Sequence, residues 1–285
     1  MSLLRHLENC NRFDAKRFRP LLFAGKPIGL VRDDNAARLA RFPETFSVAA
    51  DAVRLIAGGG FDAVSEAVDR IVERLVADGA VAKWRYESFA VTPAWGEPPL
   101  FKIDRGAVPF LGVRAYGVHL NGWRRGSDDR LRLWIGRRAT DKKVAPDKLD
   151  NLVAGGIGYP HGIDDTLVKE AEEEAGMTAT MVASATAQGH VSYRMDWETG
   201  ARDDVLYIYD LETPDDFVPR NRDGEIVEFH LMDADEVLER VDRSDDFKFN
   251  VNLVIIDFAL RHGLIAADHP EYPALKAGLR PSEAA

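Results

Sequence analysis

Apolar and polar positions are spaced differently in the two halves of the chain. In the first half, apolar runs on both sides of Gly25-Lys26-Pro27 predict a hairpin over residues 21–31, and apolar residues three or four positions apart predict a helix ending near Ala77. The first twenty residues are expected to contain a short amphipathic helix. A loop rich in proline and glycine follows at 93–99. We therefore predict a small α+β domain over residues 1–107.

The second half is expected to contain more strands than helices. Its strands are predicted at 110–120, 130–138, 149–154, 179–188, 190–197, 203–211 and 225–231, and its helices at 166–175, 233–241 and 250–262. Strands mixed with a few helices, and not alternating with them, favour an α+β sandwich with a mixed sheet over residues 108–270. Residues 271–285 are expected to form a loose C-terminal tail.

The helix at 166–175 carries a concentration of negative charge. Glu170, Glu173 and Glu174 are three and four positions apart, so they share one face of the helix, and Gly176 is a natural C-terminal stop. Three like charges on one face repel one another. A hard divalent cation, which prefers oxygen ligands, would turn this repulsion into binding. The plainer alternative is a solvated acidic face, which is what most acidic runs on helices are.

Composition narrows the classes of protein that fit. The 285 residues carry a formal net charge of −10, which argues against a general binder of nucleic acid or anionic membranes, because such proteins usually present a basic face. The single cysteine, Cys10, excludes an internal disulfide and a multi-cysteine zinc site. No apolar run is long enough to cross a bilayer and no N-terminal targeting pattern is evident, so a cytoplasmic location is expected.

The residues around the acidic helix resemble the signature of the Nudix (MutT-like) hydrolases. That signature reads Gly, five residues, Glu, seven residues, Arg-Glu-apolar, one residue, Glu-Glu, one residue, Gly-apolar. Gly155 opens the pattern here, and Lys169-Glu170-Ala171-Glu172-Glu173-Glu174-Ala175-Gly176-Met177 closes it in register. Two positions differ. His161 stands in place of the first Glu, and Lys169 stands in place of Arg, which keeps the positive charge but loses the bidentate geometry of a guanidinium.

Shorter stretches outside this signature resemble one Nudix subgroup. They include Arg137-Arg138, Leu149-Asp150-Asn151, Glu8-Asn9-Cys10-Asn11-Arg12-Phe13 and Trp84-Arg85-Tyr86-Glu87. The subgroup is related to the Nudix domain that is fused to thiamine pyrophosphokinase in some fungi, and the likeness covers most of the chain. It implies a Nudix α/β/α sandwich with a mixed sheet, preceded by the small α+β domain.

The resemblance also implies an activity and a set of site residues. The expected reaction is metal-dependent hydrolysis of a diphosphate linked to another moiety, in this subgroup thiamine diphosphate or an oxidised analogue, to the monophosphate, with Mg²⁺ or Mn²⁺ as cofactor. The expected partner is a small-molecule diphosphate, not a nucleic-acid polymer or a membrane, and a homodimer is one assembly open to the chain. The implied residues are, for catalysis, Glu173, Glu170 and Lys169; for metal binding, Glu170, Glu173 and Glu174; for phosphate binding, Gly155, Gly156 and Lys143; and as a further base or ligand, Glu225 or Glu228.

Several alternatives stay open at this stage. A Nudix-fold protein that binds or senses a ligand after losing catalysis is favoured by His161 in the first acid position. For Glu225 and Glu228, an exposed strand edge is an equally good explanation. Lys142 and Lys143 either contact substrate phosphates or are solvated at the surface. The tryptophans considered for stacking a flat heterocycle are Trp84, Trp123 and Trp134.

Overall fold

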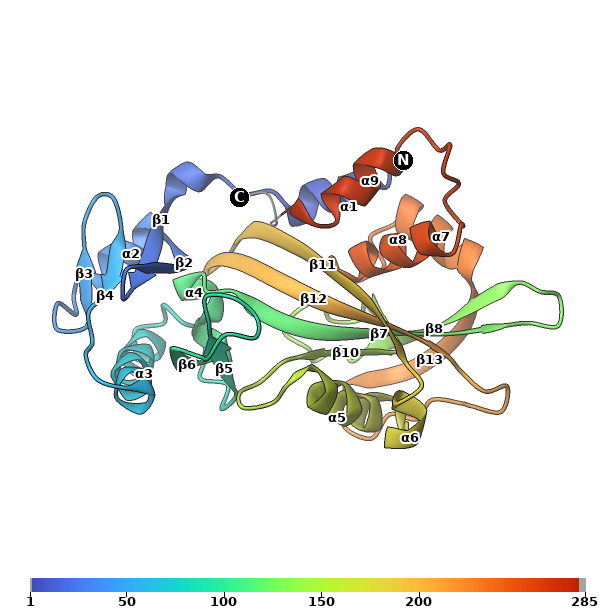
Figure 1. The fold of residues 1–285 in the computed structure, drawn as a ribbon, viewed down its shortest axis with the longest axis horizontal. Coiled ribbons are helices and arrows are strands. Elements are labelled where there is room, and N and C mark those ends of the chain that lie inside the picture. The colour runs from blue at the N-terminus through green and yellow to red at the C-terminus, as the bar shows by residue number, and fades with distance from the viewer. Residues whose placement is uncertain (1, 282–285) are drawn as a thin grey trace.

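Residues 2–281 are described in a computed structural model, and Figure 1 labels its helices and strands. The helices are α1 (Leu4–Cys10), α2 (Asp33–Leu39), α3 (Phe61–Ala77), α4 (Val108–Leu111), α5 (Ile163–Ala175), α6 (Ala179–Val182), α7 (Ala234–Arg243), α8 (Val251–Arg261) and α9 (Tyr272–Gly278). The strands are β1 (Phe18–Phe23), β2 (Lys26–Arg32), β3 (Phe46–Val48), β4 (Val53–Leu55), β5 (Ser88–Val91), β6 (Phe101–Asp104), β7 (Ala115–Arg125), β8 (Leu131–Arg138), β9 (Leu149–Asp150), β10 (Val153–Gly156), β11 (Thr186–Trp197), β12 (Gly200–Glu212) and β13 (Ile226–Asp233).

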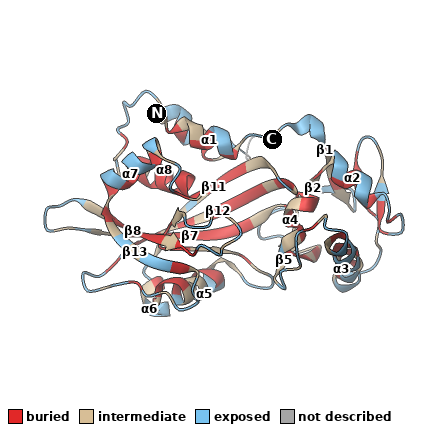
Figure 2. Cartoon of the chain, turned by 180° about the vertical axis from the view of Figure 1, so that it is seen from behind, coloured by how far each residue is buried: buried red, intermediate tan, exposed pale blue. Residues whose placement is uncertain are grey.

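A seven-stranded mixed sheet forms the centre of the C-terminal half. Its strand order is β11-β12-β7-β8-β13, with β10 added beside β7 and β9 added beside β8. β12 runs parallel to β7, and the other pairings are antiparallel. Side chains alternate along β7, so Tyr116, Val118 and Leu120 share one face of the sheet. The buried middle of β7, β11 and β12 is drawn in red in Figure 2.

Helices cover both faces of this sheet (Figure 1). On one face, α5 and α6 pack against the sheet, and Leu167 and Ala171 of α5 are buried in the same cluster as Val118. On the other face lie α7 and α8, and every residue of α8 from Val251 to Leu260 is buried. Helix α8 is apolar on nearly all sides because α1 and α9 cover the surface that the sheet leaves free. The predicted α/β/α sandwich with a mixed sheet is therefore confirmed.

The N-terminal half has its own sheets and its own core. β1 and β2 form the predicted hairpin within a four-stranded sheet of order β2-β1-β4-β3, and β5 pairs with β6 in a separate two-stranded sheet. Helix α3 buries its apolar face in this core through Val64, Val68 and Ile71. The core continues through α4, so the division between the two cores falls between Val113 and Tyr116, later in the chain than the predicted residue 107.

Close backbone approach and buried hydrogen bonds join the two halves. The buried side chain of Asn35 donates to the carbonyl of Phe110 at 3.1 Å and to that of Thr199 at 2.7 Å. Gly200 has a φ of 152° and lies so close to α4 that a Cβ would overlap the carbonyl oxygen of Pro109. The start of β12 is therefore held against the N-terminal half.

Two short segments that read as strands are helices. Residues 108–111 form α4, which begins with Pro109 in its first turn and ends at Gly112 with a φ of 59°, so β7 starts only at Ala115. The predicted strand at 179–188 begins as α6, whose first turn is capped by the hydroxyl of Thr178 accepting from the N–H of Met181 at 3.3 Å. In both cases local capping outweighs the apolar composition that suggested a strand.

Both ends of the described chain pack against the C-terminal half. Helix α1 buries Leu7 and Cys10 in the core around α8, so this helix packs with the C-terminal half. Helix α9 buries Leu275 in the same core, and Gly278 approaches α1 so closely that a Cβ would lie 2.5 Å from Cδ2 of Leu7. The expectation of a loose tail is wrong for residues 271–281, because their apolar face has a partner, and residues 282–285 lie outside the described part.

Candidate active site

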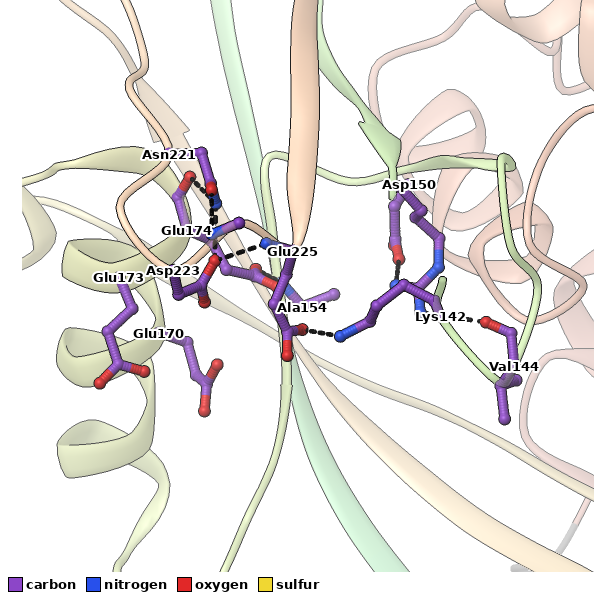
Figure 3. A network of polar contacts seen from close by, with 12 residues as sticks. Lys142, Val144, Asp150, Ala154, Glu170, Glu173, Glu174, Asn221, Asp223 and Glu225 are labelled. Atoms are coloured by element: carbon purple, nitrogen blue, oxygen red, sulfur yellow. Dashed lines mark hydrogen bonds and ion pairs between the residues drawn. The ribbon is translucent and has the colours of Figure 1, made fainter. Parts of the chain in front are cut away.

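Helix α5 presents the acidic face that the sequence predicts. It ends at Gly176, which has a φ of 67°, so the predicted glycine stop is confirmed. A Cβ at Gly176 would lie 2.9 Å from the carbonyl oxygen of Arg220, so the glycine also permits the close approach of the segment after β12. Figure 3 shows Glu170 and Glu173 projecting from the helix, while Glu174 turns toward strand β10.

Glu174 is a buried carboxylate. It is 2% exposed and accepts a 2.7 Å hydrogen bond from the backbone N–H of Ala154. Burial raises the pKa of Glu174 well above its usual range, and the negative charges of Asp150, Glu170 and Glu225 raise it further. Within residues 2–281, no cationic side chain forms an ion pair with it. A bound cation would relieve this accumulation of buried negative charge.

Glu170 lies against the strand that carries the two glycines. A Cβ at Gly155 would be 2.9 Å from Oε1 of Glu170 and would overlap its Cγ and Cδ. A Cβ at Gly156 would lie 2.7 Å from Cζ of Phe89, which reaches across from β5 in the N-terminal half. Both glycines therefore make room for a neighbouring side chain, a packing requirement that the sequence did not reveal. Their contact with phosphate stays a prediction.

Lys169 lies between two of the acidic side chains. Its Nζ is 3.0 Å from Oε1 of Glu170 and 2.8 Å from Oε2 of Glu173. Burial disfavours the charged ammonium, but the hydrogen bonds to Glu173 and Glu170 outweigh it and raise the pKa of Lys169 above its usual range. Lys169 is therefore a cation throughout the physiological pH range. The replacement of Arg by Lys at this position keeps a positive charge among the carboxylates.

A fourth carboxylate reaches the acidic face from a distant part of the chain. Glu225, just before β13, forms an ion pair with Lys142, and Figure 3 shows this pair beside Ala154. Burial raises the pKa of Glu170, and the charge of Glu225 contributes to this, as it does for Glu174. Glu225 therefore lies within electrostatic reach of the carboxylates on α5.

The segment before β13 is fastened to the end of α5. The N–H of Arg220 donates to the carbonyl of Ala175 at 3.0 Å, and the N–H of Arg222 donates to that of Glu173 at 2.8 Å. Asp223 then accepts from the N–H of Glu225 at 2.8 Å. These bonds satisfy carbonyls that the helix end leaves free, and they hold Glu225 in place.

The structure distinguishes Glu225 from Glu228 and Lys142 from Lys143, which the sequence offered as equal candidates. Glu228 is half-exposed and pairs with Arg137 at 3.0 Å and with His230 at 3.3 Å, on the strand and away from α5. Lys143 is exposed and forms no ion pair with any residue from 2 to 281, whereas Lys142 pairs with Glu225. Glu225 and Lys142 are thus the pair that the fold brings to the acidic face.

Comparisons with known proteins identify the family. Residues 120–252 match the model of the NUDIX domain, and residues 2–115 match a domain of unknown function (DUF4743). "Nudix hydrolase 24, chloroplastic" of Arabidopsis thaliana is 38% identical to the chain over 97% of this chain and 77% of that protein. The chain belongs to the Nudix hydrolase family. It is a Nudix pyrophosphohydrolase.

Two further relatives are similar to parts of the chain. "Nudix hydrolase 20, chloroplastic", also of Arabidopsis thaliana, is 41% identical over 76% of this chain and 58% of that protein, so the chain spans less than two thirds of its length. A crystal structure of a protein from Deinococcus radiodurans is similar over 59% of this chain and 97% of its own, with a TM-score of 0.46 and 19% identity.

The first acid position of the Nudix signature, which His161 occupies, lies in a surface loop of this protein. His161 is exposed, and its backbone N–H donates to the carbonyl of Gly158 at 2.8 Å in the loop between β10 and α5. All the carboxylates that the Nudix signature supplies in this protein therefore lie on α5. A role for Glu225, which lies outside this signature, as a further base or ligand stays a prediction.

The carboxylates near α5 have the ligand chemistry of a site for a hard divalent cation, but their side chains do not converge on one point. Their oxygens are the ligands that Mg²⁺ prefers, and burial, with a smaller contribution from neighbouring carboxylates, raises the pKa of Glu170 and of Glu174. Within residues 2–281, however, no three His, Cys, Asp or Glu side chains converge as a metal site. Lys169 bridges two of the carboxylates and Lys142 holds Glu225. A cation at Glu170, Glu173 or Glu225 would compete with these lysines for the carboxylates.

A buried polar network behind the acidic face was missed by the sequence analysis. Asp150, 1% exposed, pairs with Arg138 at 2.7 Å and with Lys248 at 3.5 Å. Nδ1 of His119 lies 2.8 Å from Oδ1 of Asn151, and burial lowers the pKa of His119 to about 4. Charged residues within predicted strands were the available signal, but their spacing does not reveal that they are buried together.

Proposed function

We propose that this Nudix pyrophosphohydrolase acts on a diphosphate attached to a flat heterocyclic compound, thiamine diphosphate or an oxidised analogue, and releases the monophosphate. The observation that carries the proposal is the acidic face of α5, where Glu170, Glu173 and the buried Glu174 lie near Glu225. The thiamine compounds are favoured by the short stretches of sequence that resemble the thiamine-related subgroup.

The reaction needs charge stabilisation and positioning more than a protein nucleophile. Water adds its oxygen to one phosphorus, the bridging P–O bond breaks, and the products are the monophosphate and inorganic phosphate. Mg²⁺ or Mn²⁺ held by the carboxylates of α5 would neutralise phosphate oxygens and lower the pKa of the attacking water. Glu173, the most exposed of the three, is assigned the role of accepting the proton from that water.

The two lysines are assigned a second role in this proposal. Lys169 pairs with Glu170 and Glu173, and Lys142 pairs with Glu225. When a cation replaces them, their ammonium groups become available to the phosphate oxygens of the substrate.

Release of inorganic phosphate, or of monophosphates where both phosphates are substituted, from a panel of diphosphates tests the proposal. The native protein, Glu173→Gln and Glu172→Gln are compared with Mg²⁺ on thiamine diphosphate, ADP-ribose, NADH and nucleotide sugars. Glu172 is the matched control because it lies on the same helix, is exposed and pairs with Arg222 at 3.0 Å. We expect Glu173→Gln to lose about a hundredfold or more in rate, as for a general base, and Glu172→Gln to keep the native rate. An inactive native protein, or an active Glu173→Gln variant, would overturn the assignment.

A second candidate is a Nudix-fold binding or regulatory protein with weakened catalysis. The exposed His161 at the first acid position favours it. Thermal-shift measurements would then show stabilisation by a diphosphate, which grows as RT ln(1 + [L]/Kd), without turnover in Mg²⁺ or Mn²⁺. Under this candidate, His161→Glu would raise a low rate of hydrolysis, whereas under the first it would change little.

Location and assembly are further proposals. No helix within residues 2–281 is long and apolar enough to cross a membrane. A cytoplasmic location is what the sequence favours, whereas the names of both plant relatives describe those proteins as chloroplastic. A homodimer is tested by light scattering of the purified protein.

A further inference from the structure

Three aromatic side chains from the two halves of the chain meet over the Nudix sheet. Trp95, in the loop between β5 and β6, has its ring centroid 4.8 Å from that of Tyr116 on β7 and 5.4 Å from that of Tyr207 on β12. The two tyrosine rings are nearly parallel, at 16°, with centroids 6.4 Å apart. Trp95, Tyr116 and Tyr207 are called the aromatic cluster below.

The aromatic cluster has two features that ordinary core packing does not require. Trp95 is 39% exposed although it is a large apolar side chain. Tyr116 is only 7% exposed, and its hydroxyl, although it lies near the guanidinium of Arg114, forms no hydrogen bond of regular geometry within residues 2–281. Buried tyrosine hydroxyls normally have a partner, because leaving one unpaired costs free energy. Both features are explained if a ligand covers the exposed ring and meets the hydroxyl.

The aromatic cluster lies next to residues of the Nudix signature. The carbonyl of Tyr116 accepts a 2.8 Å hydrogen bond from the N–H of Ile157, two residues after Gly155. Tyr116 lies on the same face of β7 as Val118, which pairs with Gly155 in the sheet. Glu170 packs against Gly155 on that face. The cluster and the acidic face are therefore separated by two residues of strand, roughly 7 Å.

The β12 side of the cluster reaches the start of α5. Tyr209 follows Tyr207 by two residues and so shares its face of the strand. Its hydroxyl lies 3.4 Å from Oδ1 of Asp164 in the first turn of α5. The cluster is thus on the same side of the sheet as the acidic helix, between that helix and the N-terminal half.

We propose that the aromatic cluster binds the flat heterocyclic ring of the substrate, and that the N-terminal half takes part in the site by supplying Trp95. Heterocycles stack on aromatic side chains, and a positively charged ring gains further attraction from their faces. The hydroxyl of Tyr116 meets a polar atom at the edge of the ring. From there the diphosphate extends toward Glu170. This inference rests on the proposed function, because it locates the ring of the proposed substrate.

Binding measured without turnover tests the aromatic cluster. Trp95→Ala and Tyr116→Phe are each made in the Glu173→Gln protein, and their affinities for thiamine diphosphate and for inorganic pyrophosphate are measured by calorimetry with Mg²⁺. Trp197→Ala is the control, since Trp197 is a half-buried tryptophan that touches Arg202 and Phe249, not the cluster. The melting temperature of every variant is measured as well.

The two ligands and the two variants give different expected results. Trp95→Ala should weaken thiamine diphosphate about tenfold, the usual effect of losing one stacking partner, and leave pyrophosphate unchanged. Tyr116→Phe should weaken binding of thiamine diphosphate about fivefold without lowering the melting temperature, because the hydroxyl makes no hydrogen bond of regular geometry within the protein. Trp197→Ala should change neither affinity.

Three outcomes would overturn the inference. The first is an equal loss for both ligands in Trp95→Ala, which would mean that Trp95 only holds the halves together. The second is no loss in that variant. The third is a Glu173→Gln protein, with Trp95 and Tyr116 in place, that does not bind thiamine diphosphate. Hydrolysis by the native protein is scored separately. Ring-dependent binding without phosphate release would leave the cluster standing and overturn the proposed function. If Trp95→Ala does not impair hydrolysis of thiamine diphosphate, the proposed function stands and the role of the aromatic cluster is overturned.

Discussion

Replacing Gly155 with alanine should remove most of the activity and preserve the fold. The added methyl would lie 2.9 Å from Oε1 of Glu170 and would overlap its Cγ and Cδ, so the side chain of Glu170 must leave its place on the acidic face. The backbone conformation at position 155 accommodates alanine, because Gly155 is not among the glycines with positive φ. The substitution therefore acts on the position of one carboxylate.

Stability and activity should respond to this change by different amounts. Alanine lowers the entropy of the unfolded chain, which stabilises the protein by about 0.4–1 kcal/mol, while moving Glu170 costs about 1–3 kcal/mol, as overpacking usually does. The free energy of unfolding should therefore fall by roughly 1–2 kcal/mol, which a domain of this size survives. Misplacing a catalytic group by about 1 Å costs about a hundredfold in rate, so kcat/KM should fall by that factor.

The assay compares Gly155→Ala with Gly158→Ala. A Cβ at Gly158 would lie 3.6 Å from the carbonyl oxygen of Ser88, an ordinary contact, so this second glycine of the same segment tests the loss of flexibility alone. Phosphate release with Mg²⁺ gives kcat/KM, and urea unfolding gives stability. If Gly155→Ala keeps native kcat/KM, or if both variants lose activity equally, the position of Glu170 is not what Gly155 protects.

Three further predictions follow from buried or paired groups. Burial lowers the pKa of His119 to about 4, so the imidazole of the unfolded chain takes up a proton first as the pH falls below 6.5. The free energy of unfolding should therefore fall by up to about 3 kcal/mol between pH 6.5 and 4. For His119→Asn, the free energy of unfolding should depend less on pH in that window. Lys142→Ala should lower the Mg²⁺ concentration for half-maximal rate by about two- to fivefold, since Lys142 competes for Glu225, whereas Lys143→Ala should not. Burial raises the pKa of Cys10 to about 12, so its thiol should react with iodoacetamide only after unfolding, as mass spectrometry would show.

The acidic helix could be predicted from the sequence because its properties are local. The spacing of Glu170, Glu173 and Glu174 places them on one face of any α-helix, and Gly176 ends the helix because it adopts positive φ without strain. The hairpin around Gly25 and the alternation along β7 and β8 are local in the same sense. Segments of four residues were not predictable in this way, since α4 and α6 depend on capping and packing that outweigh weak intrinsic preferences.

The tryptophan over the Nudix sheet was not among those that the sequence suggested. Trp134 is buried in the core, as the alternation of its strand favours, and Trp123 packs near His262 on another part of the fold. Trp95 was overlooked because it lies in a proline- and glycine-rich loop, where no periodicity shows which way a side chain points. Only the docking of the N-terminal half against β7 and β12 brings it to Tyr116.

By itself, the sequence determined a helix with three carboxylates on one face, a glycine-bearing strand before it, and a chain of mixed strands around it. Tertiary structure alone decided what meets that helix: Glu225 and Lys142 from distant loops, Trp95 from the other half, and α1 and α9 behind α8. The physical reason is that helix geometry follows from bonds between near neighbours. Burial and ion pairing depend on contacts between residues far apart, and no spacing rule along the chain encodes those contacts.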